Sequence, residues 1–286
     1  MRKVLLFGGT GNVGRAIARE LQQHSAYAVT AVVRNQERAA VLKNLVSHTV
    51  VANVLDTISL QGLCEGFDVV ISALGKSVSP NDKSKPSFQE VDLDANTNIL
   101  NEALKSGVNK FVYVSAFHAE KYVHLEYFRT HHVFSERLKK SGIDYSIIKP
   151  PAVFSSFLDL MAMAKKGQLI TLGKGQRLTN PIYEGDLAKI CVASIQQHNV
   201  VIEAGGKETL SRSAINETIQ RLVAPNKRVR SVPLGLVKAG LPIVKLIDKN
   251  NYDKFAFFAE VMQHDTVAPA MGEMTLETYV KSQLEA

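Results

Sequence analysis

The chain has 286 residues, of which 45% are hydrophobic, and its 34 Lys and Arg residues against 27 Asp and Glu give a formal net charge of +7. This composition is typical of a globular protein and excludes disordered and collagen-like chains. A length near twice the usual ~150 residues of a domain allows two modest domains or one large α/β domain. The basic residues form only short clusters such as 227–230, which argues against a nucleic-acid partner.

Membrane spans and cysteine-based frameworks are not expected from the sequence. No stretch approaches the roughly 18 uncharged apolar residues that a membrane span requires, and the N-terminus lacks the apolar core of a signal peptide. Cys64 and Cys191 lie far apart and in no paired motif, so neither a disulfide framework nor a zinc site is indicated. We therefore expect a cytoplasmic protein.

The first half of the chain alternates short apolar runs with amphipathic stretches. Strands rich in Val and Ile are expected at residues 3–7, 28–33, 48–51, 69–72, 110–115 and 145–148. Helices are expected at 13–23, 37–45, 87–106 and 126–140. Because strands without polar alternation suit burial on both faces, the pattern predicts a Rossmann-type, doubly wound parallel sheet within residues 1–150.

The segment from Gly75 to Pro86 is polar and contains two prolines, which predicts a loop. It follows the carboxyl end of a strand, the edge at which ligands bind in open α/β sheets. The loop is therefore a candidate substrate lid, and the alternative is a solvated loop without a role.

The alternation becomes less regular after Pro151. Helices are expected at 155–166, 184–197, 211–223 and 251–264, and a strand near 200–203 is expected to return to the sheet. Residues 151–286 are thus predicted to be a small, mainly helical substrate region. The apolar stretch 232–247 has three candidate uses: a buried helix, which we favour, a dimer surface, or a peripheral membrane contact.

A glycine-rich turn with the sequence GGTGNVG occupies residues 8–14, between the first strand and the first helix. Its first glycine permits a tight turn, its second lets a pyrophosphate approach the backbone, and its third lets the helix pack on the strand. The helix N-terminus then offers free N–H groups to the anion. The predicted cofactor contacts in this turn are Gly8, Thr10, Gly11, Asn12, Val13 and Gly14.

The second strand ends at Arg34, with Arg38 one helical turn beyond. Proteins that bind NAD usually carry an acidic residue here to hold the ribose 2′-hydroxyl, whereas an Arg can pair with the 2′-phosphate of NADP. We therefore expect NADP(H) in preference to NAD(H). The alternative is that both arginines merely face solvent at a helix start.

The chain resembles the atypical short-chain dehydrogenase/reductases, in particular their NmrA-like branch. Beyond the glycine turn, the resemblance is carried by segments 33–34, 51–56, 68–75, 91–98, 111–116 and 141–150, and more loosely by 180–188. It implies that Asn53 and Val54 flank the adenine and that Ala73, Leu74 and Gly75 lie along the cofactor. Family members commonly have Asp where this chain has Asn53.

The same resemblance identifies candidate catalytic residues. Reductases of this kind pair a Tyr with a Lys four residues later, helped by a Ser near the end of the fifth strand, and the Lys cation lowers the Tyr pKa. Ser115 and Tyr127 fit their places, but His131 occupies the place of the Lys. A mostly neutral His supplies less positive field than Lys. Lys149, where many relatives have Arg, is expected to face the cofactor cleft and to contact the substrate or a phosphate, and the alternative is that it is simply exposed.

No metal site is predicted. His118, His124, His131 and His132 lie close in sequence, but they form no His-Glu-x-x-His pattern and have no nearby Cys.

Two functions remain open at this stage. The first is an NADP(H)-dependent oxidoreductase that transfers hydride to a small carbonyl, quinone or flavin-like acceptor. The second is a non-catalytic NADP(H)-binding sensor or regulatory protein of the NmrA-like type. The glycine turn fits both. His131 favours the second, whereas Ser115 with Tyr127 and the candidate lid favour the first. We expect a small-molecule substrate and a monomer or homodimer.

Overall fold

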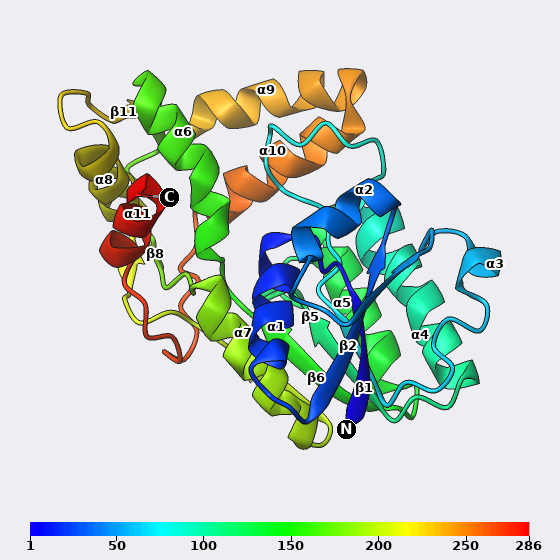
Figure 1. Cartoon of the computed structure of the whole chain (residues 1–286). Helices are drawn as coiled ribbons and strands as arrows, with labels where there is room; N and C mark the ends of the chain where they lie inside the picture. The colour runs from blue at the N-terminus through cyan, green and yellow to red at the C-terminus, as the bar shows by residue number, and fades with distance from the viewer. Residues whose placement is uncertain (286) are drawn as a thin grey trace. The chain divides into compact units, whose positions relative to one another are not determined.

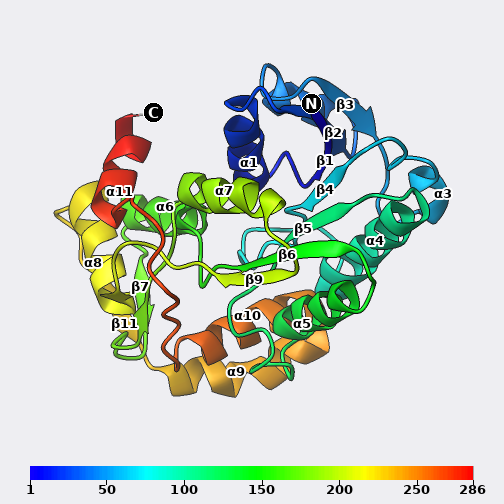
Figure 2. The ribbon, with the colours of Figure 1, turned by 90° about the horizontal axis from the view of Figure 1, so that it is seen from below.

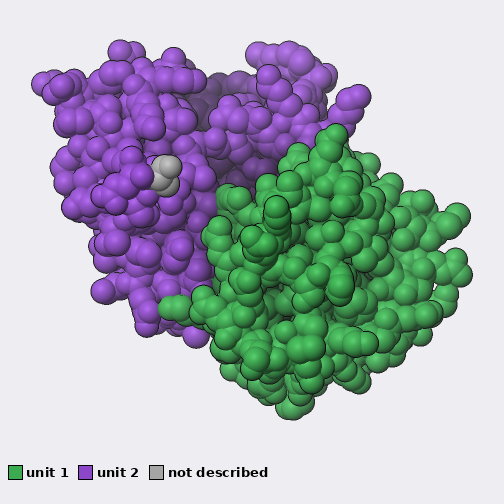
Figure 3. Space-filling view, in the orientation of Figure 1, with its two compact units in different colours: residues 1–76, 86–149, 187–202 green, residues 77–85, 150–186, 203–286 purple. Residues whose placement is uncertain are grey.

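The computed structural model describes residues 1–285, which form two compact units. The first unit contains residues 1–76, 86–149 and 187–202, and the second contains residues 77–85, 150–186 and the chain from Glu203 onward (Figure 3). The loop predicted between Gly75 and Pro86 therefore belongs mostly to the second unit.

A seven-stranded sheet forms the centre of the first unit, with the strand order β3-β2-β1-β4-β5-β6-β9. All five pairings from β3 to β6 are parallel, which confirms the predicted Rossmann-type α/β fold. The strands lie within a residue of their predicted positions: β1 Arg2–Phe7, β2 Tyr27–Val33, β3 His48–Val51, β4 Val69–Ser72, β5 Lys110–Val114, β6 Asp144–Lys149 and β9 Val200–Glu203.

Helices cover both faces of this sheet (Figure 2). On one face Phe7 and Tyr113 belong to a buried cluster with Leu100 of α4 (Ala95–Lys105) and Phe134 of α5 (Glu126–Lys139). On the other face α1 (Asn12–Gln22) buries an apolar stripe that includes Ile17. Burial on both sides is the reason that these strands are continuous apolar runs rather than alternating ones.

Two predicted helices are interrupted. The segment 37–45 is a short helix, α2 (Gln36–Ala39), followed by a 3-10 turn, η1 (Ala40–Leu42). The segment 87–106 begins with π-helical turns, η2 (Gln89–Asp94), before α4 starts. Such turns are often found at functional sites. The remaining helices that contribute to the first unit are α3 (Thr57–Leu60), α7 (Glu184–Ala193) and the 3-10 turn η4 (Ser194–Gln196).

The second unit is mainly helical, as predicted. Its core contains Phe154, Met161, Ile219 and Tyr279, contributed by η3 (Phe154–Phe157), α6 (Leu158–Lys166), α8 (Arg212–Val223) and α11 (Leu276–Glu285). The short strands β7 (Ile170–Leu172) and β11 (Arg230–Val232) pair in parallel, and β8 (Leu178–Thr179) and β10 (Leu210–Ser211) pair antiparallel.

The apolar stretch 232–247 forms a helix, α9 (Leu234–Ile247), that packs against α10 (Lys249–Val261) (Figure 1). The favoured prediction of a buried helix is wrong, because α9 has no buried residue. One side of α9 lies against α10 while the other side faces solvent, so burial in the protein core does not explain why both sides are apolar. No helix in residues 1–285 combines the length and the apolarity needed to cross a bilayer.

Candidate functional site

The turn after β1 has the backbone shape that its glycines require. Gly8 has a φ of +75°. A Cβ atom on Gly8 would lie 2.5 Å from the carbonyl oxygen of Ala73, and one on Gly14 would lie 2.1 Å from the carbonyl oxygen of Gly8. A Cβ on Gly11 would contact only Gly8 O, at 3.4 Å, and would otherwise point into open space. Gly8 and Gly14 therefore build the turn, while Gly11 leaves its surface open to a close-lying ligand.

The N-terminus of α1 follows this turn and is suited to an anion. Gly11 is the N-cap, no side chain caps the helix, and its first turn contains no acidic residue. The side chain of Arg15 donates to Asn12 Oδ1 at 2.5 Å. The leading N–H groups are thus available to a phosphate, and the helix dipole favours negative charge there.

Arg34 and Arg38 are both exposed just beyond the carboxyl end of β2. Asn35 begins α2 by accepting a hydrogen bond from the backbone N–H of Arg38 at 3.1 Å. Within residues 1–285 neither guanidinium forms a hydrogen bond or an ion pair. Their charges are therefore available to a ligand at the carboxyl edge of the sheet, where the glycine turn also lies.

The residues expected along the cofactor line the same edge of the sheet. Asn53 is exposed, and its Oδ1 accepts from the N–H of Leu55 at 3.2 Å, which leaves the amide Nδ2 for a ligand. Val54 is fixed through its carbonyl oxygen, which accepts from Asn98 Nδ2 at 3.1 Å. Ala73, Leu74 and Gly75 follow β4, the strand next to β1.

Ser115, Tyr127 and His131 all belong to the first unit, at the end of β5 and on α5. Ser115 is buried, and its Oγ lies 3.1 Å from Ser135 Oγ. The ring centroids of Tyr127 and His131 are 4.7 Å apart, as expected for residues four positions apart on a helix. The structure thus brings the candidate Tyr and the residue in the Lys place side by side.

His131 is a neutral side chain in this structure. Burial lowers its pKa to about 3. Its Nδ1 lies 2.6 Å from the hydroxyl of Tyr113, whose pKa is raised by burial, so the Tyr113 O–H donates and Nδ1 accepts. His131 therefore does not supply the cationic field that a Lys would give at this position.

Asp92 is the residue of this region that the sequence did not single out. It is fully buried, and its Oδ1 accepts from the N–H of Lys76 at 2.9 Å. Its Oδ2 has no hydrogen-bond partner among the described residues. Burial raises the pKa of Asp92 to about 8, and its charge raises the pKa values of Tyr113 and Tyr127. The available signal was weak, because Asp92 lies between Val91 and Leu93 in a segment that also contains Glu90 and Asp94.

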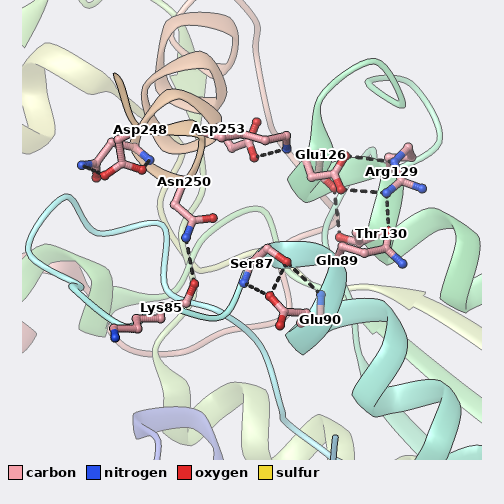
Figure 4. A network of polar contacts seen from close by, with 12 residues as sticks. Lys85, Ser87, Gln89, Glu90, Glu126, Arg129, Thr130, Asp248, Asn250 and Asp253 are labelled. Carbon is pink, nitrogen blue, oxygen red and sulfur yellow. Dashed lines mark hydrogen bonds and ion pairs between the residues drawn. The ribbon is translucent and has the colours of Figure 1, made fainter. Parts of the chain in front are cut away.

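Hydrogen bonds connect the start of α5 to η2 (Figure 4). Arg129 donates to Glu126 Oε1 at 2.7 Å and also to Gln89 of η2. Ser87 donates through its N–H to Glu90 Oε2 at 2.7 Å, which secures the beginning of η2. These contacts connect the element that carries Tyr127 to the one that carries Asp92.

Lys149 is nearly buried, and its ammonium lies 2.7 Å from Glu120 Oε2. The cation thus has a carboxylate partner within the first unit, and its expected contact with the cofactor stays a prediction. No group of His, Cys, Asp and Glu in residues 1–285 could hold a metal ion.

Comparisons with known proteins agree with this geometry. A family model described as NAD(P)H-binding matches residues 8–219. The photosystem II assembly factor Ycf39 of Cyanophora paradoxa is 26% identical over 240 residues, which cover 82% of this chain and 73% of that protein.

Two solved structures share the fold over nearly their whole length. The NADPH-dependent quinone oxidoreductase QOR2 of Escherichia coli, complexed with NADPH, superposes with a TM-score of 0.72 at 19% identity, covering 98% of this chain and 99% of that one. The triphenylmethane reductase of Citrobacter sp., complexed with NADP(H), has a TM-score of 0.75 at 14% identity, with 98% and 99% covered.

Proposed function

The chain belongs to the NAD(P)H-binding family, and we propose that it is an NADPH-dependent oxidoreductase that transfers hydride to a small carbonyl, quinone or flavin-like acceptor. The observation that carries this proposal is the glycine turn joined to an uncapped helix N-terminus, with Ser115 and Tyr127 in the same unit. Bound NADPH would supply the hydride, and the protein would supply position and proton transfer.

The preference for NADPH over NADH rests on Arg34 and Arg38. Both guanidinium groups lack a protein partner within residues 1–285 and follow β2, where an acid would favour NAD. A charge-assisted contact with the 2′-phosphate contributes about 1.5 to 3 kcal/mol, or roughly ten- to a hundredfold in affinity. Titration with both cofactors tests this preference, and NADH binding as tight as that of NADPH would contradict it.

We assign the proton transfer to Tyr127. Its pKa is raised, chiefly by burial, so its hydroxyl keeps its proton at neutral pH and can donate to the acceptor oxygen as hydride arrives. Ser115 would hold that oxygen by a hydrogen bond. At neutral pH the carboxyl of Asp92 is protonated, so no anion faces the developing phenolate.

A non-catalytic NADP(H)-binding sensor or assembly protein is the second candidate. It is favoured by neutral His131 in the place of the Lys, because a neutral imidazole supplies no positive charge to stabilise a phenolate at Tyr127. The similar protein that is named as an assembly factor points the same way.

One experiment separates the two candidates. NADPH oxidation is measured with a panel of quinones, flavins, aldehydes and ketones, using the wild type, Tyr127→Phe and the control Tyr145→Phe. As a reductase, the protein turns over an acceptor, and Tyr127→Phe loses about 10² to 10⁴ in kcat with unchanged NADPH binding. Tyr145→Phe keeps its activity. No oxidation with any acceptor, together with retained NADPH binding, favours the sensor.

A small-molecule substrate, a monomeric or homodimeric state and a cytoplasmic location complete the proposal. Sedimentation of the purified protein measures the oligomeric state directly.

A further inference from the structure

Asp92 lies in the π-helical turns of η2, and a side chain of the next helix holds its backbone there. Asn96 of α4 donates through Nδ2 to the carbonyl oxygens of Val91 and Asp92, at 3.4 and 3.0 Å. Asn96 Oδ1 in turn accepts from the hydroxyl of Ser72, in the last position of β4, at 2.5 Å. The backbone at Asp92 is therefore tied to the carboxyl edge of the sheet, where the glycine turn also lies.

The two oxygens of the Asp92 carboxyl have different surroundings. Oδ1 accepts from the N–H of Lys76 at 2.9 Å, and a Cβ on Gly75 would lie only 3.2 Å from this same oxygen. Oδ2 is buried and has no hydrogen-bond partner in residues 1–285. Because buried polar atoms nearly always have a partner, we expect Oδ2 to gain one when the site is at work.

Asp92 belongs to a cluster with titratable rings of β5 and α5. Burial raises the pKa values of Tyr113 and Tyr127, and the charge of Asp92 is the next cause for both, which places the carboxyl near both hydroxyls. The ring of Phe88, which precedes η2, contacts that of Tyr127 with centroids 5.6 Å apart. The Tyr113 hydroxyl is engaged, because it donates to His131 Nδ1 at 2.6 Å. Tyr127 is therefore the phenol on which Asp92 can act.

The charged groups around Asp92 leave its carboxyl protonated at neutral pH. Burial raises the pKa of Asp92 to about 8, and the nearby Lys76 cation offsets only part of this rise. On the same element, Glu90 is exposed and Asp94 accepts a hydrogen bond from a neighbouring amide at 2.7 Å. His131 of α5 is neutral. Asp92 thus brings an O–H group, and not an anion, to the cluster.

We propose that Asp92 is a positioning residue for Tyr127: as a neutral acid, it donates a hydrogen bond from Oδ2 to the Tyr127 oxygen when that tyrosine gives up its proton. This inference rests on the proposed reductase function. It supplies what His131 does not, since a hydrogen-bond donor stabilises a phenolate without placing a cation in a buried cluster.

The protons balance in this step. The Tyr127 O–H bond breaks and its proton passes to the acceptor oxygen, while the hydride of NADPH reaches the acceptor carbon. Asp92 keeps its proton throughout and only shares it with the phenolate. Water then returns one proton to Tyr127.

Two substitutions of similar size separate a donor from a mere filler of space. In Asp92→Asn the amide oxygen is expected to keep the place of Oδ1, because the N–H of Lys76 requires an acceptor there. The amide nitrogen then takes the place of Oδ2 and donates at every pH. Asp92→Leu fills the same space without a donor.

The phenolate can be observed directly when Tyr127 is replaced by a difluorinated tyrosine, which ionises at lower pH and changes its absorbance as it does so. The ionisation constant of this analogue should be about ten- to a hundredfold larger with Asp92→Asn than with Asp92→Leu, as expected for a hydrogen bond to a charged group. The matched control is Asp94→Asn, two residues along the same element, which should leave the constant as in the wild type.

The wild-type protein provides a second comparison if Asp92→Leu does not fold. Above pH 8 the ionised Asp92 can no longer donate, and its charge opposes the phenolate. Above that pH the analogue should therefore ionise less readily in the wild type than in Asp92→Asn.

The pH dependence of kcat tests the same residue during turnover. With an acceptor that the wild type reduces, kcat should fall above pH 8 as Asp92 ionises, and Asp92→Asn should abolish this fall. At pH 7 Asp92→Leu should lose about ten- to a hundredfold in kcat, with KM and NADPH affinity unchanged, and Asp92→Asn should restore most of the rate.

Equal ionisation constants of the analogue in the Asn and Leu variants would overturn the proposal, as would an alkaline fall of kcat that persists in Asp92→Asn. The absorbance measurement needs neither an acceptor nor turnover. A protein that reduces no acceptor would therefore contradict the proposed function, whereas the response of the analogue to Asp92 would still decide this inference.

Discussion

Replacing Asp92 by Asn is expected to change how the stability of the protein depends on pH. In an unfolded chain this carboxyl ionises near its ordinary pKa of 3.8, whereas burial in the folded protein raises its pKa to about 8. Between these values the folded state binds one proton more than the unfolded state. The free energy of unfolding therefore falls as the pH rises, by about 1.4 kcal/mol per pH unit.

His131 has the opposite effect over a lower pH range. Its ordinary pKa of 6.5 is lowered by burial to about 3, so between these values the unfolded state binds the extra proton. The free energy of unfolding then rises with pH by a similar amount per unit. The two contributions cancel between about pH 4 and 6.5, and only the fall due to Asp92 remains between about pH 6.5 and 8. That fall amounts to about 2 kcal/mol.

Urea unfolding followed by far-UV circular dichroism, from about pH 4.5 to about pH 9, measures this dependence. The wild type should show a plateau followed by a decline above pH 6.5. Asp92→Asn should instead rise up to pH 6.5 and then stay level, and the control Glu37→Gln, at an exposed position of α2, should follow the wild type. A wild-type curve that stays level through pH 8, or an Asp92→Asn curve parallel to it, would refute the reasoning. The wild-type curve alone suffices if Asp92→Asn does not fold.

Four other substitutions test the site and the sheet. Gly14→Ala should destabilise the protein by several kcal/mol, because its Cβ would lie 2.1 Å from a backbone oxygen. Gly11→Ala should fold normally and bind NADPH more weakly. Equal melting temperatures of the two variants would contradict this difference. Arg34→Gln should weaken NADPH binding about ten- to a hundredfold and leave NADH binding unchanged, as isothermal titration would measure. An equal loss of affinity for both cofactors would contradict the proposed contact of Arg34 with the 2′-phosphate. Asp144→Ala should lower the free energy of unfolding by about 2 to 4 kcal/mol, because it removes the carboxylate that lies 3.1 Å from the buried Lys110 ammonium. An unchanged urea midpoint would argue against a stabilising ion pair.

The sequence by itself determined the features that depend on short stretches of chain. Strands β1 to β6 were predicted within a residue because strands buried on both faces must be apolar throughout. The turn at residues 8–14 was recognisable because its backbone excludes side chains at Gly8 and Gly14. Each of these constraints is recorded within a few consecutive residues, as an apolar run or as a spacing of glycines, so it can be read from the order of residues.

Tertiary structure decided the protonation of the candidate site. The sequence placed His131 four residues after Tyr127, but only the fold brings the Tyr113 hydroxyl to its Nδ1 and buries both side chains. It likewise buries Asp92 and raises its pKa. A pKa depends on desolvation and on charges from distant segments, and the local sequence contains neither.

Helix α9 gives the clearest contrast between the two levels. Its sequence established an apolar helix, and the favoured prediction was that the protein core covers it. The structure covers only the side next to α10 and leaves Leu246 and Ile247 exposed. Periodicity shows which positions are apolar, but the surface that buries each one is decided by the packing of elements far apart in the chain.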